Sequence, residues 1–446
     1  MAANTDNSAD APEVTITQAL VYAIQLQQHN ELDSAEEIYR RILEAVPEQG
    51  DALHFLGVLQ SQRGKRDAAI TLIRRACELI PNHADCYINL GNVLADSGRL
   101  PEAATAYHHA LALAPERGDV FNNLGVVFKL LGRWEEAETS YLRAIELEPD
   151  ATGAYNNLGL LHASRGHIKE AVHYYCLSID KKPDNPDSRR LLGVAYYSLG
   201  RVSEAAEVFE EWMKLEPDSP VARHLHAACS GDSVPDRAAD DYVEQTFDRF
   251  ADSFDSQLQG NLSYRAPELV VDALERARPG STANLDILDA GCGTGLCGPL
   301  LRPYARQLSG VDLSGGMLIK ADARQCYDAL TKGELTAFIA AQSRKFDLII
   351  SADTLVYFGP LEAVFAASRQ ALRAKGLLIF TVEQLPPERD ETGFAINPHG
   401  RYAHGHHYLE TTLIKTGFEL RSIDAADLRT EGGKPVKGWV VTAQVQ

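Results

Sequence analysis

The chain has 446 residues with 43 basic and 62 acidic side chains, so its formal charge is −19. This length exceeds one ordinary domain, and a composition of 45% apolar and 24% charged residues excludes a chain that is disordered from end to end. The sequence has no uninterrupted apolar run of 18 residues, and its first residues lack a basic start followed by an apolar stretch. We therefore expect neither a membrane span nor a secretory signal.

The cysteines and the distribution of charge add two further expectations. The seven cysteines are scattered and form no CxxC pair, which favours reduced thiols in a cytoplasmic protein and predicts no zinc site. Residues 1–240 hold 22 basic and 36 acidic side chains, a balance of −14, against −5 for the remainder. A surface of that sign repels phosphate backbones, so nucleic acid is not an expected partner.

A repeat of 34 residues fills the first half of the chain, after residues 1–15, which we expect to be disordered. Prolines recur at this interval at Pro47, Pro81, Pro115, Pro149, Pro183 and Pro217. In phase with them stand Leu-Gly pairs that begin at Leu56, Leu90, Leu124, Leu158 and Leu192, and turn glycines at Gly64, Gly98, Gly132, Gly166 and Gly200. Tyr39, Tyr107, Tyr141, Tyr175 and Phe209 share one later position, with Ile73 as the exception.

The spacing of these residue types predicts paired helices. Small residues let two helices approach closely, an aromatic ring fills the remaining gap, and a proline ends the second helix. The pattern resembles the tetratricopeptide repeat over residues 16–219, in six units of 34. The resemblance implies an all-α solenoid with a concave groove.

Three asparagines recur one residue before the Leu-Gly pair: Asn89, Asn123 and Asn157. In relatives of this repeat, asparagines at this position line the groove and bond the backbone of an extended peptide. The resemblance therefore implies a protein or peptide partner in the groove. The alternative is that the three side chains are solvated or form hydrogen bonds within the repeats.

The repeat pattern ends after Pro217, where glycine, serine, aspartate and proline accumulate. This composition predicts a linker over residues 220–240 and a second domain over residues 241–446.

The first candidate ligand-binding segment of the second domain is a glycine turn. Residues 285–301 read as a short apolar strand, the glycines Gly291, Gly293 and Gly295, and the start of a helix, which is the arrangement that lets a backbone approach a ligand closely. The same segment contains a GxGxxG motif, which is also found in sites that bind a dinucleotide. Asp289, at the end of the strand, favours instead a ligand with a cationic amino group.

The next strand ends in Asp312, whose carboxylate can accept hydrogen bonds from both hydroxyls of a ribose. Apolar segments at residues 346–358 and 361–383, followed by the segments 417–424 and 438–444, predict further strands and helices that end in an antiparallel pair. Alternating strands and helices predict a doubly wound, Rossmann-like α/β sheet.

This order resembles class I S-adenosylmethionine-dependent methyltransferases across nearly all of residues 241–446. The whole chain resembles the bacterial group of predicted methyltransferases with N-terminal tetratricopeptide repeats. The resemblance implies S-adenosyl-L-methionine as cofactor, with Asp289 and the glycine turn at its methionine end, Asp312 at the ribose, and Ala352 and Asp353 near the methyl group. The cofactor-binding residues that it implies are Asp289, Gly291, Cys292, Gly293, Gly295, Asp312, Leu313, Glu334, Leu335, Ala352 and Asp353, with Glu334 and Leu335 at the adenine.

Two further segments bear on the resemblance: a helical segment before the first strand and the turn before the fifth strand. Residues 242–267 resemble the helical lid of such enzymes, and its apolar side is formed by Tyr242, Phe247, Phe250 and Phe254. Before the fifth strand, where relatives have Leu-Arg-Pro-Gly-Gly, this chain has Ala374 and Lys375 ahead of Gly376. We expect this departure to affect the stability of a turn more than activity.

Methyl transfer from a sulfonium requires an aligned nucleophile and the exclusion of water, with a base if the acceptor carries a proton. Residues 397–410 follow the fifth strand on the acceptor side, so we expect His404 and Tyr402 as catalytic residues and Arg401 as an anchor for an anion or a carboxylate. Tyr357 is either a wall of the substrate pocket or part of the core. The alternative for each histidine of this segment is that it is an ordinary surface residue with no catalytic role. His404, His406 and His407 lack a carboxylate or thiolate partner at ligand spacing, so no metal site is expected. Cys292 is expected to pack and not to act as a nucleophile.

Three hypotheses follow. The first is an S-adenosylmethionine-dependent methyltransferase whose repeats recruit a protein or peptide-linked acceptor. The second is a small-molecule methyltransferase that its repeats dock to an assembly, and the third is a non-catalytic repeat scaffold with a cofactor-sensing domain. A nicotinamide oxidoreductase is a more distant alternative, which Asp289 and the terminal strand pair disfavour.

Overall fold

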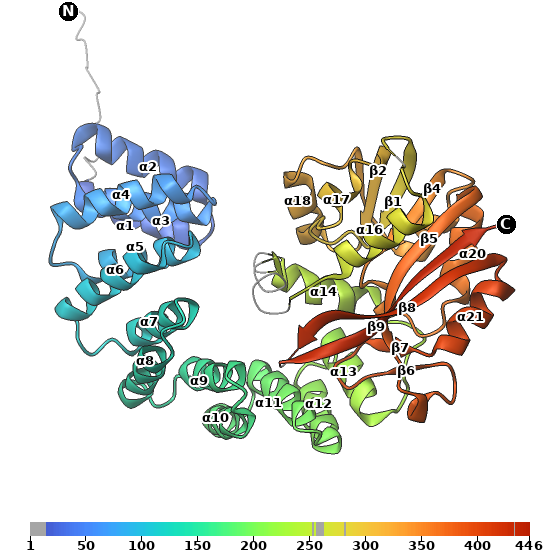
Figure 1. Cartoon of the computed structure of the whole chain (residues 1–446). Coiled ribbons are helices and arrows are strands. Elements are labelled where there is room, and N and C mark those ends of the chain that lie inside the picture. Colours follow the sequence, from blue (N-terminus) through green and yellow to red (C-terminus); the bar gives the residue numbers. More distant parts are fainter. Residues whose placement is uncertain (1–14, 252–253, 256–262, 281, 432) are drawn as a thin grey trace, which may run out of the picture. The chain divides into compact units, whose positions relative to one another are not determined.

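The computed structural model describes residues 15–251, 254–255, 263–280, 282–431 and 433–446 (Figure 1). The chain forms two compact units, Met1–Pro183 and Asp184–Gln446, and each is described by itself. Within the described ranges, no helix has the length and apolar character that a membrane crossing requires. The expectation of disorder for residues 1–15 falls outside the described residues except at Thr15, which caps the first helix.

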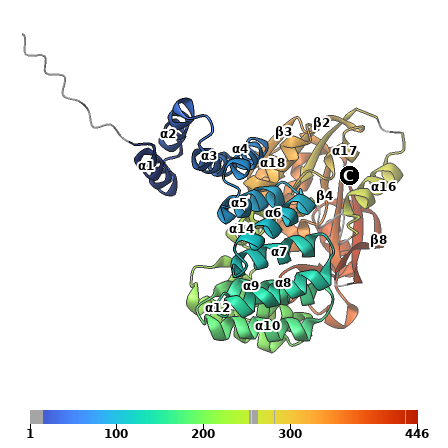
Figure 2. The same ribbon diagram turned by 90° about the vertical axis from the view of Figure 1, so that its left-hand side faces the viewer.

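The first unit consists of paired helices, which follow one another in Figure 2. The helices are α1 (Ile16–Gln28), α2 (Leu32–Ala45), α3 (Gly50–Gln62), α4 (Arg66–Leu79), α5 (Ala84–Asp96), α6 (Leu100–Leu113), α7 (Gly118–Leu130), α8 (Trp134–Leu147), α9 (Thr152–Ser164) and α10 (Ile168–Lys181). The helix pairs keep the predicted 34-residue period, which confirms the all-α solenoid.

Close contact between the two helices of a hairpin depends on the glycine of each Leu-Gly pair. A Cβ atom added to Gly91 of α5 would lie 2.5 Å from Cε1 of Tyr107 on α6, and one added to Gly159 would lie 2.3 Å from Cε1 of Tyr175. The aromatic ring therefore occupies the space that any larger residue would need, and it packs on the glycine of its own hairpin.

The second unit begins with a hairpin of the same kind, α11 (Pro186–Ser198) and α12 (Val202–Leu215), followed by α13 (Pro220–Ser230) and α14 (Asp240–Phe250). The sequence predicts a linker over residues 220–240, whereas the structure has a helix over most of its first half. Ser219 caps α13, Pro220 occupies its first turn, and Gly231 ends it with φ +78°. These are ordinary helix start and stop signals that the composition of the segment obscured. Only residues 231–239 connect α13 to α14.

The rest of the second unit is a mixed sheet with helices on both faces. Its strands are β1 (Leu285–Ala290), β2 (Ala305–Asp312), β3 (Ala329–Lys332), β4 (Phe346–Ser351), β5 (Leu372–Gln384), β6 (Phe394–Ile396), β7 (Tyr402–His404), β8 (Phe418–Glu431) and β9 (Lys434–Val445). Its helices are α16 (Ala266–Ala277), α17 (Gly298–Leu301), α18 (Gly315–Ala323), α19 (Leu335–Ala340), α20 (Glu362–Ala371) and α21 (His406–Lys415).

The strands β3-β2-β1-β4-β5 are parallel in that order, and β9 and β8 add an antiparallel pair to β5. The predicted doubly wound sheet with a terminal antiparallel pair is confirmed. Alternate residues of β1 enter different cores: Leu288 packs with α19, α20 and α21, whereas Ile287 packs with α16 and α17. A doubly wound sheet binds its ligand where the strand order reverses, which here is the carboxyl edge of β1 and β4.

Candidate active site

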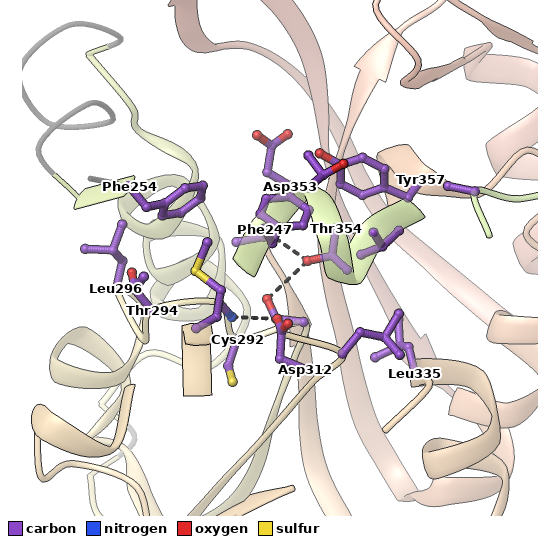
Figure 3. A pocket seen from close by; sticks show the side chains of 18 of the residues that line it. Phe247, Phe254, Cys292, Thr294, Leu296, Asp312, Leu335, Asp353, Thr354 and Tyr357 are labelled. Carbon is purple, nitrogen blue, oxygen red and sulfur yellow. Dashed lines mark hydrogen bonds between the residues drawn. The ribbon is translucent and has the colours of Figure 1, made fainter. Parts of the chain in front are cut away.

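A cavity of about 300 Å³ lies at this edge of the sheet. Its lining comes from the loops that follow β1, β2 and β4, together with α14 and the end of β8. Figure 3 shows Asp312 and Leu335 on one side of the cavity and Phe247 and Asp353 on the opposite side. The switch point of the sheet and the cavity therefore coincide.

Asp312 is held by the backbone around it. The amide of Gly293 donates to its Oδ2 at 2.9 Å and the amide of Ser314 donates to its Oδ1 at 2.9 Å. Burial nevertheless raises the pKa of Asp312 above the usual value for an aspartate. A Cβ added to Gly293 would meet no atom within 4 Å, so the glycine leaves open space beside this carboxylate. The amide of Gly293 therefore joins the glycine turn to Asp312, a contact that the sequence analysis did not predict.

The predicted adenine residues lie next to Asp312. Leu313, Glu334 and Leu335 all line the cavity. The carboxylate of Glu334 caps α19, where it accepts hydrogen bonds from the amides of Thr336 and Ala337 at 3.0 and 2.7 Å. The apolar side chain of Leu335 is the part of this segment that can face a flat ring.

Asp289 lies behind the cavity lining. It is buried, and the hydroxyl of Tyr327 donates to its Oδ2 at 2.6 Å. Burial raises the pKa of Asp289 to about 7, and the nearby Asp312 adds to this effect. The sequence places Asp289 against the ligand, whereas in the structure its buried side chain does not line the cavity.

At the end of β4, Ala352, Asp353 and Thr354 line the cavity. Asp353 adopts φ +57°, a backbone conformation that is uncommon for a residue other than glycine and occurs preferentially at functional sites. Its amide donates to Oγ1 of Thr381 at 2.8 Å, and both carboxylate oxygens accept from Nη1 of Arg429 at 2.8 and 2.7 Å. The side chain is therefore fixed at the cavity wall.

Asp353 belongs to an ionic group in which Glu383 and Arg429 are buried and the other members are half-buried. We call it the arginine–carboxylate cluster, formed by Asp353, Glu383, Arg401, Arg429 and Glu431. Arg401 donates to Glu383 at 2.7 Å and to both oxygens of Glu431 at 2.7 and 2.8 Å. Arg429 also contacts Glu383, and its Nε donates to Glu431 at 2.7 Å. Burial opposes ionisation of Glu383, yet the guanidinium groups, led by Arg401, lower its pKa to about 2. Arg401 lines the cavity as predicted, but carboxylates of the chain itself occupy its guanidinium.

The predicted lid is present in its described part. Phe247, Phe250 and Phe254 line the cavity, whereas Tyr242 is buried and stacks on His224 with ring centroids 3.9 Å apart. The residues 252–253 and 256–262 of the predicted lid lie outside the described residues.

Polar contacts join the lid to the floor of the cavity. Oγ of Ser314 donates to Asp248 at 2.5 Å, and Lys332 pairs with Glu244 at 2.5 Å. These contacts connect α14 to the loops after β2 and β3, which hold the predicted cofactor residues.

The prediction that His404 and Tyr402 are catalytic is not supported, because neither side chain lines the cavity. Both are buried: Nε2 of His404 donates to the carbonyl of Gly359 at 2.9 Å, and the hydroxyl of Tyr402 donates to the carbonyl of Pro235. Burial lowers the pKa of His404 to about 4. Tyr402 and His404 share one face of β7 because side chains alternate along a strand, and that face points into the core.

The remaining histidines of this segment form no metal centre. His406 and His407 are exposed, and the described part of the chain contains no group of three His, Cys, Asp or Glu side chains that could hold a metal ion. Cys292 is buried in the cavity wall, where burial raises the pKa of its thiol, in keeping with the packing role expected for it.

Tyr357 lines the cavity and contacts Phe247 edge to face at a centroid distance of 5.6 Å. The structure adds lining residues that the sequence analysis missed, namely Arg237, Tyr264, Thr354, Arg429 and Glu431. Arg429 and Glu431 come from β8, far from the glycine turn in sequence, and no local motif marks them.

In the first unit, the three asparagines are half-buried and bonded to the preceding repeat. Asn89 Nδ2 lies 2.9 Å from Nε2 of His54, Asn123 donates to Asn92 at 3.3 Å, and Asn157 donates to Asn122 at 2.9 Å. The contacts join neighbouring repeats, whereas the alternative expected hydrogen bonds inside one repeat. They leave a role in peptide binding as a prediction.

Comparisons with known proteins agree with both parts of the chain. A family model described as a methyltransferase domain matches residues 258–422. Two tetratricopeptide repeat models match residues 23–84, 88–152 and 129–186, and residues 162–229.

Curated relatives match parts of the second unit. Methyltransferase-like protein 27 of Homo sapiens is 46% identical over 86 residues, which cover 19% of this chain and 35% of the human protein. Malonyl-[acyl-carrier protein] O-methyltransferase of Pseudescherichia vulneris is 30% identical over 139 residues, 31% of this chain and 52% of that protein. The probable S-adenosylmethionine-dependent methyltransferase CRG1 of Saccharomyces cerevisiae is 27% identical over 188 residues, 38% of this chain and 62% of that protein. The chain thus spans between about a third and two thirds of these relatives.

Solved structures match the repeats. The type IV pilus biogenesis factor PilW aligns with a TM-score of 0.44 and 19% identity over 48% of this chain and 98% of PilW. YrrB, a tetratricopeptide repeat protein, aligns with a TM-score of 0.34 and 26% identity over 42% of this chain and 96% of YrrB. The family models and the fold identify the chain as one that carries tetratricopeptide repeats followed by a methyltransferase domain.

Proposed function

We propose that the protein is an S-adenosyl-L-methionine-dependent methyltransferase whose repeats recruit a protein or peptide-linked acceptor. The observation that carries this proposal is the cavity at the switch point of the sheet, where the amide of Gly293 is bonded to Asp312 beside an open glycine turn. When bound, S-adenosylmethionine supplies a methyl group activated by a positively charged sulfur.

The residues of the cavity fit such a molecule. Asp312 keeps lone pairs for ribose hydroxyls after its two amide bonds, and Leu335 offers an apolar surface to the adenine. Asp289 does not line the cavity, and it is partly ionised at neutral pH because burial raises its pKa to about 7. A carboxylate in that position favours a cationic ligand over a pyrophosphate.

The lid covers the cavity and contributes to the proposed methyl transfer. Phe247, Phe250 and Phe254 give the cavity an apolar cover, and Asp248 and Glu244 tie that cover to the floor. A covered cavity excludes water from the reacting atoms and holds donor and acceptor in line.

Two observations support recruitment of a protein or peptide by the repeats. A tetratricopeptide solenoid presents an extended concave surface of the kind that repeat proteins use for binding. One relative is named for its action on a malonyl group attached to an acyl carrier protein, an acceptor borne by a protein. Tethering of this kind raises the local concentration of the acceptor.

The test of catalysis uses S-adenosylmethionine labelled at the methyl group, a cell extract as the source of acceptors, and the full chain. We expect label in the protein fraction with the wild-type chain and none above background with Asp312→Ala. Asp328→Ala is a matched control, because Asp328 accepts from the amide of Leu308 on β2 but does not line the cavity. Label confined to small molecules would contradict recruitment of a protein acceptor.

The test of recruitment replaces Asn89, Asn123 and Asn157 by alanine together. We expect labelling of the protein fraction to fall while affinity for S-adenosylmethionine stays unchanged, because the three residues belong to the first unit and the cavity to the second. Unchanged labelling would remove the peptide-binding role of these asparagines.

A further inference from the structure

The cavity wall at the end of β4 carries a net negative charge. In the arginine–carboxylate cluster, the carboxylates of Asp353, Glu383 and Glu431 face only two guanidinium groups, those of Arg401 and Arg429. Both oxygens of Asp353 accept hydrogen bonds from Nη1 of Arg429, as a carboxylate does beside a guanidinium, and on this geometry we count Asp353 as charged although burial raises its pKa. His399, 3.5 Å from Glu383, adds no positive charge at neutral pH because burial and the nearby Arg401 lower its pKa to about 4.

No guanidinium in this wall is left for a substrate carboxylate, as far as the described residues extend. Arg401 is engaged by Glu383 and by both oxygens of Glu431, and Arg429 is engaged by Asp353, Glu383 and Glu431. The other arginine of the lining, Arg237, pairs with Asp240 at 2.5 Å. A carboxylate acceptor would have to displace an internal one against the charge of the cluster.

Aromatic rings border the same part of the cavity. Phe247 contacts Tyr357 at 5.6 Å and Phe254 at 5.9 Å between ring centroids, both edge to face, and all three line the cavity together with Tyr264. Ring faces attract cations, and aromatic enclosures are used to recognise methylated ammonium groups. The rings and the cluster therefore favour the same charge on the acceptor.

On the basis of the proposed function, we infer that the acceptor group is an amine, and that the arginine–carboxylate cluster selects amines against carboxylates. An amine enters as a cation, which the net negative wall attracts. One proton of the ammonium group passes to a carboxylate oxygen of Asp353 and from there to water, which leaves a neutral amine. The lone pair of the nitrogen forms the new C–N bond while the C–S bond breaks and its electron pair stays on sulfur. The positive charge passes from sulfur to the methylated nitrogen, which the wall and the rings stabilise.

The chemical form of the transferred label tests this inference. The full chain is incubated with methyl-labelled S-adenosylmethionine and cell extract, and the labelled material is divided into two portions. Mild alkali releases methanol from a methyl ester, whereas an N-methyl group survives acid hydrolysis and is recovered on an amine. We expect the label in the alkali-stable, amine fraction.

The specificity role of the cluster is tested by Glu431→Gln, which removes its excess negative charge and weakens the hold on Arg401. We expect the ratio of ester label to amine label to rise by about tenfold. Glu419→Gln on the same strand is the matched control, because Glu419 is exposed and does not line the cavity, and we expect it to leave the ratio unchanged.

The outcomes separate the two proposals. Label on an ester or an ether in the wild-type reaction overturns the inference and leaves the proposed function standing. Label on amines with a ratio that Glu431→Gln does not change overturns the role of the cluster. No label above the Asp312→Ala background overturns the proposed function, and the inference with it.

Discussion

The sixth repeat hairpin has the same contact between a glycine and an aromatic ring as the third, fourth and fifth hairpins, but different surroundings. A Cβ added to Gly193 of α11 would lie 2.3 Å from Cε1 of Phe209, the same distance as for Gly159 and Tyr175 in the fifth hairpin. The first five hairpins belong to the first unit, whereas α11 and α12 belong to the unit that holds the cavity. The repeat motif therefore predicts the packing inside a hairpin, but it does not predict to which unit the hairpin belongs.

Helix α13 connects the sixth hairpin to the cavity. Nε2 of His224 donates to the carbonyl of Gly400 at 2.8 Å, and the thiol of Cys229 lies 3.5 Å from the carbonyl of Pro398. The loop that these residues contact carries Arg401, and the ring of His224 stacks on Tyr242 of the lid helix. Helix α13 thus supports two walls of the proposed active site.

Truncation at two positions gives the largest expected effect. Residues 184–446 should unfold cooperatively and bind S-adenosylmethionine as tightly as the full chain. Removal of residues 1–230 also takes away α13 and the buried Leu225, and should lower the melting temperature by about 10 °C or more. Calorimetric unfolding of the two truncated chains measures the difference. Equal melting temperatures would show that α13 is only a connector.

A matched pair of substitutions compares the fifth and sixth hairpins. Gly159→Ala and Gly193→Ala each force a methyl group against an aromatic ring, which should cost about 2 kcal/mol of unfolding free energy. Gly193→Ala should also weaken donor binding, whereas Gly159→Ala should not. The measurements are chemical unfolding and titration with S-adenosylmethionine. If both variants bind the donor equally well, the sixth hairpin does not differ from the fifth.

The contact between α13 and the Arg401 loop should depend on pH. Burial lowers the pKa of His224, so the folded state disfavours its protonation and this contribution to stability is lost as pH falls below the unfolded value of about 6.5. His224→Phe should cost about 1 kcal/mol at pH 8, because the carbonyl of Gly400 loses its donor, and less at pH 5.5. Urea unfolding at both values tests this. A deficit that grows as pH falls would contradict the assignment.

The smallest expected effect concerns one residue in each unit whose backbone adopts the left-handed conformation with positive φ. Lys375 has φ +60° in the segment where relatives have glycines, and Asn30 has φ +63° at the turn where later repeats have glycine. Lys375→Gly should stabilise the second unit by about 1 kcal/mol. Asn30→Gly should change the first unit less, because asparagine tolerates this conformation. Thermal unfolding of both variants gives the comparison, and a loss of stability in Lys375→Gly would refute it.

The sequence was informative where a feature repeats or is local. The 34-residue period predicted the hairpins, and the alternation of strands and helices predicted the sheet. The glycine turn and Asp312 were each predicted at the ligand end of a strand, and both border the cavity. Each of these depends on residues that are close in sequence or on elements in chain order.

The sequence was least informative where distant segments meet. Arg429 reaches Asp353 because β8 pairs with β9 and β9 with β5, and no motif near either residue records that pairing. His404 and Tyr402 were predicted to face the reacting groups, but both are buried in β7 outside the cavity lining, and a strand of three residues gives no pattern that predicts which side chains are buried. The helix in residues 220–240 was missed for a different reason, because glycine and aspartate, which are typical of linkers, accumulate beside its capping residues Ser219 and Gly231.

The central claim is that the cavity binds a sulfonium donor through Asp312 and the glycine turn. Calorimetric titration of the full chain with S-adenosylmethionine, repeated with a nicotinamide dinucleotide and with Asp312→Ala, tests it most directly. We expect binding of S-adenosylmethionine at one site, loss of that binding in Asp312→Ala, and no heat with the dinucleotide. Binding of the dinucleotide in place of S-adenosylmethionine, or S-adenosylmethionine affinity that survives the substitution, would contradict the account.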